Sequence, residues 1–314
     1  MSSSDASGAD DRALRVICGP TAAGKSAIAL RMAARNGCAI VSADSRQLYR
    51  GFDIGTAKPT AAERDLVEHF GIDVADPSER WSAARWAAAA AEWIDESESR
   101  GASAVVVGGT GFYVAALERP LDHAPALDQR QRAALAQLLR TFPLDELRRW
   151  ATILDPARAH LGRTQLLRAV ETALLSGRRL SDAHVGRDRA GKPEREFRYL
   201  VVDPGREALR ERIAARVDAM LDAGWVDEVR RLREQVPPDA PAWNATGYTA
   251  LREHVEGRGS LADARERVII DTRQYAKRQR TWFRHQLPGH ATTRVHPDDP
   301  ELDTRLAAWW SGAS

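Results

Sequence analysis

Short apolar runs alternate with amphipathic stretches in the first third of the chain. The runs are rich in branched side chains and are typical of buried strands: Leu14 to Cys18, Ala39 to Ser42 and Ala104 to Val107. A helical pattern begins at Gly24, and another follows Ser82, whose hydroxyl can cap the first amides while Trp86 and Trp93 form a packing stripe. This alternation predicts a parallel sheet covered by helices.

The pattern changes between Asp122 and Arg189, where strand signals are absent. Helical segments rich in Leu, Ala and Arg take their place: Asp128 to Arg140, Leu144 to Ile153 and Thr164 to Ser176. A strand pattern returns at Phe197 to Val202, and helical patterns then begin at Arg206, Trp225, Tyr248 and Leu261. We therefore predict a core domain over residues 13–121 and 190–314, interrupted by an all-helical insertion over residues 122–189.

The composition excludes several classes of protein. A chain of 314 residues, 43% hydrophobic and 29% charged, is large enough for a core domain plus a smaller one, and no apolar stretch approaches the length of a membrane span. Residues 1–12, MSSSDASGADDR, lack the basic start and apolar middle of a secretion signal. We expect these twelve residues to form a disordered tail.

The two cysteines and the small net charge give little information about function. Cys18 and Cys38 fall in apolar runs that we interpret as neighbouring strands, and no Cys or His spacing is typical of a metal site. We predict buried, reduced thiols, which fit the cytoplasm. The formal charge of +2 is uninformative by itself, so the distribution of charge matters more.

The segment GPTAAGKS follows the first predicted strand and opens the first predicted helix. It matches G-x-x-x-x-G-K-[ST] at every fixed position, in the strand-to-helix setting that this phosphate-binding motif requires. Backbone amides and the helix N-terminus would surround an anion, Lys25 would add a full charge and Ser26 would ligate Mg²⁺. The predicted phosphate-binding residues are Gly19, Pro20, Thr21, Ala22, Ala23, Gly24, Lys25 and Ser26. The predicted fold class is thus α/β, with a P-loop NTPase-like parallel sheet core and the all-helical insertion.

An acidic residue follows the second predicted strand. In nucleotide hydrolases an apolar strand ends in an acid that helps to hold the metal, whereas Ala104 to Val107 continues into Gly-Gly-Thr-Gly. Asp44 should lie beside the phosphate loop, because ligands gather at the carboxyl ends of parallel strands. We interpret Asp44 as a candidate general base; the alternative is that it only caps a turn.

Residues 265–284, RERVIIDTRQYAKRQRTWFR, carry seven basic side chains against two acidic ones, with three aromatic residues interleaved. Four of the cations recur at helical spacing and would form one stripe suited to the phosphates of a nucleic acid: Arg273, Lys277, Arg280 and Arg284. A solvated helix face is the alternative. The phosphate motif and the arginines of the insertion favour RNA.

Six motifs in order resemble the tRNA dimethylallyltransferases, the IPP transferase family, over residues 14–286. They are GPTAAGKS, SADSRQLYRGFDIGTAKPT, VGGTGFY, RIAARVDAMLDAGWVDEVRRL, TGYTAL and TRQYAKRQRTWFR. The resemblance implies transfer of a dimethylallyl group from dimethylallyl diphosphate to N6 of adenine 37 in tRNA, with release of pyrophosphate. It also implies Mg²⁺ as cofactor and the anticodon stem-loop as partner; we expect a monomer with no membrane attachment.

The same resemblance implies roles for particular residues. Lys25 and Ser26 match the residues that hold the diphosphate with Mg²⁺, and Arg216 is similar to a further diphosphate contact. Thr110 matches a threonine that lines the channel where the target base meets the diphosphate and contacts tRNA. Asp44 matches the catalytic aspartate and begins a tRNA-contacting segment formed by Asp44, Ser45, Arg46 and Gln47.

The insertion departs from the family pattern R-[IL]-x-R-A-L-E. Arg168 matches the second arginine, but Gln165 replaces the first, and the preceding turn is shorter. We assign Gln165 and Arg168 to tRNA binding, and the missing charge bears on affinity for the anticodon stem.

Two other functions remain open from the residues alone. A small-molecule kinase would share the phosphate loop but would not need the basic helix. An RNA-binding module with a vestigial loop would bind tRNA regardless of isoprenoid diphosphate.

Overall fold

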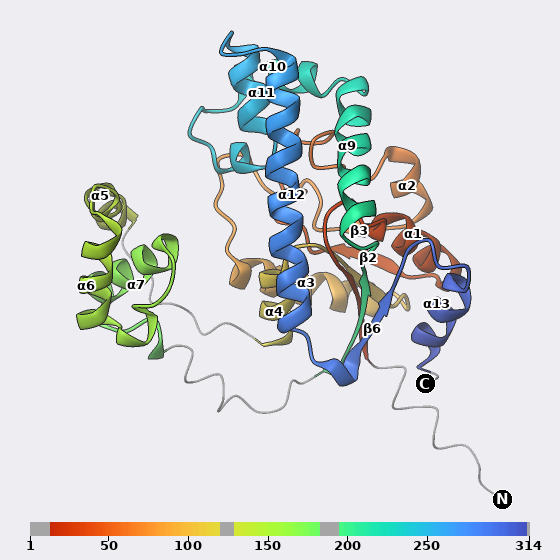
Figure 1. The fold of residues 1–314 in the computed structure, drawn as a ribbon. Helices are drawn as coiled ribbons and strands as arrows, with labels where there is room; N and C mark the ends of the chain where they lie inside the picture. Colours follow the sequence, from red (N-terminus) through yellow and green to blue (C-terminus); the bar gives the residue numbers. More distant parts are fainter. Residues whose placement is uncertain (1–12, 120–128, 183–194, 313–314) are drawn as a thin grey trace, which may run out of the picture. The chain divides into compact units, whose positions relative to one another are not determined.

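A computed structural model describes residues 13–119, 129–182 and 195–312. The predicted tail and the two ends of the predicted insertion, residues 122–128 and 183–189, lie outside the described residues. The chain divides into two compact units (Figure 1): residues 119–193 form one, and the segments on either side form the other.

A parallel sheet forms the centre of the larger unit. Its six described strands lie in the order β3-β2-β4-β1-β5-β6, with every neighbouring pair parallel. The strands are β1 (Leu14–Cys18), β2 (Ala39–Ser42), β3 (His69–Phe70), β4 (Ala104–Gly108), β5 (Phe197–Val202) and β6 (Thr292–Val295). The predicted α/β fold with a parallel sheet is confirmed. The order of the strands reverses beside β1, and ligands of such sheets bind at the carboxyl ends of the strands at that point.

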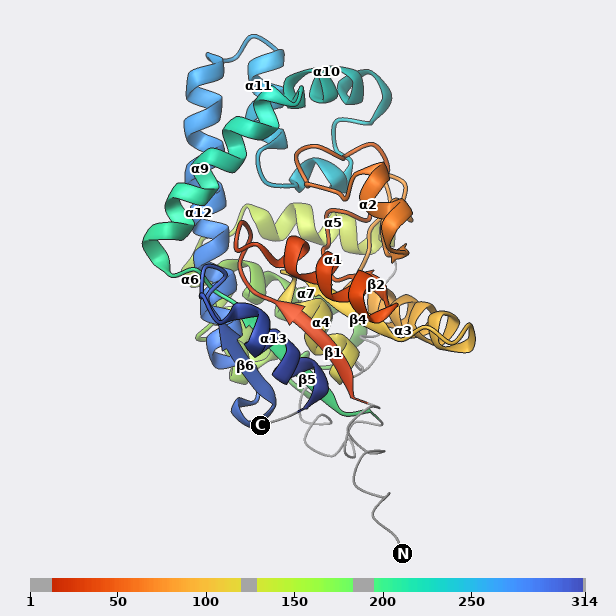
Figure 2. The same ribbon diagram turned by 90° about the vertical axis from the view of Figure 1, so that its right-hand side faces the viewer.

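Helices cover both faces of this sheet because successive strand residues point to opposite sides. Val16 packs into the cluster that contains Trp86 and Tyr113, whereas Ile17 packs against Ile28 on the other face. The first face carries α3 (Ala83–Ser99) and α4 (Gly111–Glu118); the second carries α1 (Lys25–Asn36) and α13 (Leu302–Ser311), as Figure 2 shows. Trp86 is fully buried, which confirms its predicted place in the core.

Four further helices of the larger unit pack against one another. They are α9 (Arg206–Asp222), α10 (Trp225–Gln235), α11 (Tyr248–Val255) and α12 (Leu261–His285). The Ser260 hydroxyl accepts a hydrogen bond from the amide of Asp263 and starts α12 with a capping box. Helices α9 and α12 lie side by side (Figures 1 and 2). Because α12 is one unbroken helix, it carries all four residues of the predicted basic stripe.

All the described secondary-structure elements of the smaller unit are helical. It contains α5 (Gln129–Arg140), α6 (Leu144–Leu154) and α7 (Arg163–Ser176), with the short 3₁₀ turn η2 (Pro156–Arg158). Its core consists of Leu139, Leu147, Ala151, Leu166 and Val170. Leu147 and Ala151 lie one turn apart on α6, as Leu166 and Val170 do on α7, so each of these helices presents one apolar side to the shared core.

Several short elements were not predicted. They are α2 (Ala61–Leu66), β3, α4, β6, α13 and the 3₁₀ turns η4 (Pro241–Asn244) and η5 (Gly289–Ala291). The strand β3 has two residues, too few for a periodic signal, and exists because it pairs with β2. Cys18 and Cys38 are buried as predicted, but β4 separates β1 from β2, so the interpretation of neighbouring strands was wrong.

None of the helices in the described ranges is both long and apolar enough to cross a bilayer.

Candidate active site

The phosphate loop connects β1 to α1. Gly19 turns the chain at φ +140°, where an added Cβ would lie 2.3 Å from the carbonyl oxygen of Val202, so glycine is required there. Ala22 and Gly24 also have positive φ, which curves the loop. The backbone amides at the start of α1 and just before it have no acceptor within the described part of the chain: Ala22, Gly24, Lys25 and Ser26. These amides are therefore available to an anion at the helix N-terminus.

Lys25 is the first residue of α1 and lies at the base of this loop. Its Nζ donates a hydrogen bond to the carbonyl oxygen of Pro20 at 2.6 Å. Burial, and secondarily the Arg216 guanidinium, lowers the pKa of Lys25 to about 8, while Asp44 opposes the shift. An anion bound in the loop would raise this pKa, because a negative charge stabilises the ammonium form.

Asp44 and Arg216 meet Lys25 from two other elements. Asp44 follows β2, and its Oδ1 accepts a hydrogen bond from the backbone amide of Arg46 at 2.8 Å. The turn cap proposed as an alternative is therefore real, but among the described residues it occupies only one carboxylate oxygen. Arg216, on α9, is half-buried; burial lowers the pKa of its guanidinium and Asp44 opposes that shift.

A cavity of about 380 Å³ brings these groups together, and Lys25, Ser26, Asp44 and Arg216 all line it. A smaller cavity of about 70 Å³ shares four lining residues with it: Thr21, Asp44, Thr56 and Arg216. The two cavities therefore adjoin at residues that include Thr21 of the phosphate loop and Asp44. This arrangement lets an anion and a proton donor meet in one space.

Thr110 holds the segment that carries Asp44 against the end of β4. Its Oγ1 accepts a hydrogen bond from the amide of Ser45 at 3.1 Å, and its own amide donates to the carbonyl oxygen of Ala43 at 3.1 Å. Tyr275 of α12 lies close enough to Thr110 for that side chain to lower the pKa of the phenol. Burial, with Asp44 adding to it, raises the pKa of Tyr275 to about 12, so the phenol stays neutral at pH 7.

Comparison with known proteins decides the family. The sequence model of a family described as IPP transferase matches residues 47–286, and one described as isopentenyl transferase matches residues 12–72. The tRNA dimethylallyltransferase of Gloeobacter violaceus is 43% identical over 283 residues, which cover 88% of this chain and 90% of that protein. The chain belongs to the IPP transferase family.

Solved structures of tRNA-modifying enzymes share its architecture. The full-length tRNA isopentenylpyrophosphate transferase from Bacillus halodurans is 32% identical, covers 94% of this chain and 93% of its own, and has a TM-score of 0.67. A eukaryotic dimethylallyltransferase acting on tRNA, 24% identical with 95% of this chain and 78% of that chain covered, has a TM-score of 0.79 and shows the same fold. The family resemblance of the six motifs is thus confirmed.

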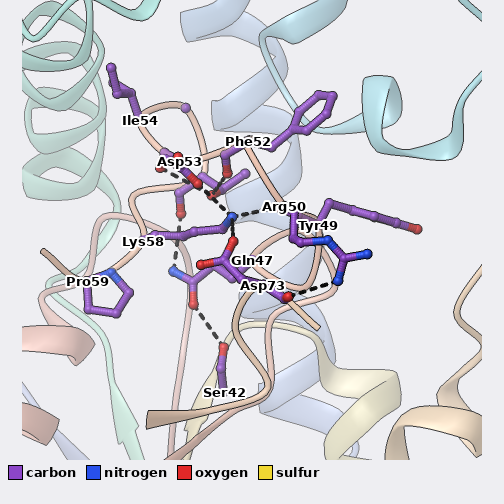
Figure 3. A network of polar contacts seen from close by, with 12 residues as sticks. Ser42, Gln47, Tyr49, Arg50, Phe52, Asp53, Ile54, Lys58, Pro59 and Asp73 are labelled. Atoms are coloured by element: carbon purple, nitrogen blue, oxygen red, sulfur yellow. Dashed lines mark hydrogen bonds and ion pairs between the residues drawn. The ribbon is translucent and has the colours of Figure 1, made fainter. Parts of the chain in front are cut away.

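In this IPP transferase family member, Gln47 has its side-chain amide bound within the protein (Figure 3). Its Nε2 donates to the carbonyl oxygens of Thr56 and Ala57 at 3.2 and 3.0 Å, and its Oε1 accepts from the Ser42 hydroxyl at 2.8 Å. These bonds hold the backbone of residues 56–57 at the cavity wall. Contact between Gln47 and tRNA stays a prediction.

Lys58 lines the larger cavity but is committed to the protein (Figure 3). Its side chain is 2% exposed, and its Nζ donates to the carbonyl oxygen of Tyr49 at 2.6 Å, to Asp53 at 2.7 Å and to Asp73. An ammonium has three donors, and all three are used. Lys58 therefore stabilises the loop and does not serve as a further cation for diphosphate.

We expect Lys58→Met to lower the free energy of unfolding by about 2 kcal/mol, because its charged hydrogen bonds are lost. The loss is no larger because Asp53 and Asp73 are partly exposed, so water can solvate their carboxylates. For a unit of this size the melting temperature should fall by roughly 4–8 °C, which calorimetry measures. Lys277→Met, at an exposed site on α12, is the matched control and should change it by less than about 1 °C. Equal effects of both variants would contradict this account.

Helix α12 presents only part of the predicted stripe to solvent. Arg273, Lys277 and Arg284 are exposed and have no ion-pair partner among the described residues. Arg280 is half-buried, and its Nε donates to Asp203 at 2.9 Å. The prediction that Arg280 binds RNA therefore rests on a cation that is already paired, whereas the other three are available.

The two predicted insertion residues lie on α7. Gln165 caps the start of that helix, since its Oε1 accepts from the amide of Gly162 at 3.2 Å, and Arg168 is exposed. Arg163, which precedes both, donates to the carbonyl oxygens of Arg140 and Phe142 at 2.8 Å. Gln165 thus has a structural role, and tRNA binding by Gln165 and Arg168 stays a prediction.

A buried carboxylate that the sequence reading missed holds the loop beside the cavity. Glu228 is 2% exposed and accepts hydrogen bonds from the Tyr248 hydroxyl at 2.6 Å and the amides of Asp53 and Ile54 at 3.1 and 2.8 Å. The Tyr248 hydroxyl accepts in turn from the amide of Gly55 at 3.1 Å. The motif TGYTAL contains Tyr248, but the spacing of these residues along the chain gives no sign of the contact.

Proposed function

We propose that this protein, a tRNA prenyltransferase by family, transfers a dimethylallyl group from dimethylallyl diphosphate to N6 of adenine 37 in tRNA and releases pyrophosphate. The observation that carries the proposal is the common cavity lined by Asp44 and the phosphate loop. Mass spectrometry of tRNA nucleosides after incubation with the labelled donor tests it. Phosphate transfer from ATP without RNA would favour a kinase, and donor-independent tRNA binding without reaction would favour an RNA-binding module.

The phosphate side of the cavity supports departure of pyrophosphate. As the allylic C–O bond breaks, negative charge grows on the leaving group and positive charge spreads over the allyl fragment. Lys25, Arg216 and the loop amides are fixed donors where that charge develops, so they stabilise it without reorganisation.

The carboxylate side supports attack by the amine. The exocyclic amine of adenine is a poor nucleophile because its lone pair is delocalised into the ring. Asp44 would accept a proton from N6 as the N–C bond forms, which contributes typically 10²- to 10⁴-fold. Thr110 fixes the segment that presents Asp44 through its bonds to Ser45 and Ala43, so the base would be held in place before the RNA arrives.

The site fits Mg²⁺ carried by the substrate. Among the described residues, no three His, Cys, Asp or Glu side chains gather as a cage, and Mg²⁺ commonly keeps its waters and binds through phosphates and one or two protein oxygens. The exposed hydroxyl of Ser26, at the first turn of α1, is the protein oxygen that would hold it. Bound there, Mg²⁺ would neutralise charge on the diphosphate.

The target base has to leave its stack to reach Asp44, as enzymes that modify bases generally require. A single-stranded anticodon loop permits this extrusion. The exposed cations of α12 and the helical unit over residues 129–182 would bind the RNA backbone. We propose that the enzyme acts as a monomer and that the reaction takes place in the cytoplasm.

The exposed stripe on α12 should determine the salt dependence of tRNA binding. We expect the double variant Arg273→Glu and Lys277→Glu to weaken tRNA binding at least tenfold and to reduce the slope of log affinity against log salt by roughly 0.7–0.9 for each lost phosphate contact. Filter binding at several salt concentrations measures both quantities.

Arg31→Glu provides the control for that variant, because α1 lies on the opposite face of the sheet from α3 and α4 and Arg31 is exposed. It should leave the slope unchanged. A wild-type slope in the double variant would place the RNA elsewhere.

A further inference from the structure

One buried side chain of α12 contacts the ends of two strands. Gln279 is 6% exposed. Its Oε1 accepts a hydrogen bond from the amide of Thr21 at 2.8 Å, and its Nε2 donates to the carbonyl oxygen of Gly109 at 2.8 Å. A single amide therefore joins the phosphate loop after β1 to the turn after β4, across 258 and 170 residues of sequence.

The fit around this amide is tight on both sides. A Cβ added at Gly109 would lie 2.3 Å from Gln279 Nε2, so glycine is needed for the approach. In the phosphate loop, Thr21 has its amide bound by Gln279, whereas the amides of Ala22 and Gly24 have no acceptor among the described residues. Gln279 thus fixes the leading edge of the loop and leaves the later amides for an anion.

The turn after β4 continues the connection to the carboxylate. Thr110 follows Gly109 and holds the amide of Ser45 and the carbonyl oxygen of Ala43, the two neighbours of Asp44. The path from Thr21 through Gln279, Gly109 and Thr110 therefore links the anion site to the base by hydrogen bonds and one peptide. Gln279 also lines the larger cavity.

We propose that Gln279 is a positioning residue, which sets the separation between the phosphate loop and the segment that carries Asp44. The inference rests on the proposed function, since it concerns the geometry in which diphosphate and amine react. A displacement of about 1 Å between reacting groups can cost 10²-fold in rate. Gln279 itself need not touch either reacting atom.

The test compares Gln279→Leu, which keeps the size of the side chain and removes both hydrogen bonds, with Gln274→Leu at an exposed site on the same helix. For Gln279→Leu we expect kcat to fall by on the order of 10²-fold and inorganic pyrophosphate to bind about tenfold more weakly, with the KM for tRNA within twofold of wild type. Gln274→Leu should leave kcat and pyrophosphate binding unchanged. Melting curves confirm that each variant is folded at the assay temperature.

Gln279→Glu supplies a readout that a merely structural side chain would not move. When protonated, its carboxyl group has one donor and one acceptor, like the amide; when ionised, it repels the carbonyl oxygen of Gly109 and the diphosphate. Burial raises a carboxyl pKa, so kcat of Gln279→Glu relative to wild type should rise at least fivefold as the pH falls from 8 to 6.

A wild-type kcat in Gln279→Leu, or a flat pH ratio for Gln279→Glu, would overturn this assignment. Failure of the proposed function is distinguished from that result, because it would appear as absence of prenyl transfer by the wild-type protein.

Discussion

Asp44→Asn should lower the rate of prenyl transfer by about 10²- to 10⁴-fold, while the Kd for tRNA should change by less than about twofold. Asparagine keeps the oxygen that accepts the Arg46 amide, so the turn is preserved and only the basic group is lost. Removal of a negative charge near Lys25 and Arg216 should also tighten pyrophosphate binding a few-fold. Single-turnover kinetics with radiolabelled donor measure the rate.

Asp76→Asn is the matched control for this variant. Asp76 accepts a hydrogen bond from the amide of Ser78 at 2.9 Å, the same turn geometry at an exposed site that does not line either described cavity. It should react at the wild-type rate. If Asp44→Asn were equally active, Asp44 would be a turn cap and not the general base.

Lys25→Met should lower turnover by about 10²- to 10³-fold, because a fixed cation next to the leaving group is removed. The Kd for tRNA should stay within about twofold of wild type. Arg31→Met, on the outer side of the same helix, should leave turnover unchanged. Equal loss in both variants would show that α1 had been disturbed, and no loss in Lys25→Met would exclude the lysine from the reaction.

Proton uptake gives an independent readout for Lys25. Its pKa of about 8 is below the ordinary lysine value, so the unbound ammonium loses its proton as the pH rises through 8. Pyrophosphate raises that pKa, so wild-type protein should take up close to half a proton more than Lys25→Met at pH 8, and no more at pH 6.5. Calorimetry in metal-free buffers of different ionisation enthalpy measures the difference; identical uptake at pH 8 would contradict the assignment.

The phosphate loop could be read from the sequence because its signal is local. Glycines at fixed spacing, a lysine and a serine between a strand and a helix identify this loop from residues that are neighbours in the sequence. The parallel sheet and α12 were predictable for the same reason, since hydrophobic periodicity over one element determines which side of it is buried. Short elements such as β3 carry no such period and form only by pairing.

The sequence by itself thus determined the strand–loop–helix segment that we predict to bind phosphate, the α/β class and the helix that carries the basic stripe. Only the tertiary structure decided which polar side chains are bonded within the protein. Arg280 pairs with Asp203, the Lys58 ammonium donates hydrogen bonds to three acceptors, and the Gln279 amide bonds to the loops that follow β1 and β4. These contacts join segments whose separation along the chain is set by topology, so no periodic pattern records them. A side chain that reads as available in the sequence becomes committed when folding brings a buried partner to it, because an unpaired polar group away from water is costly.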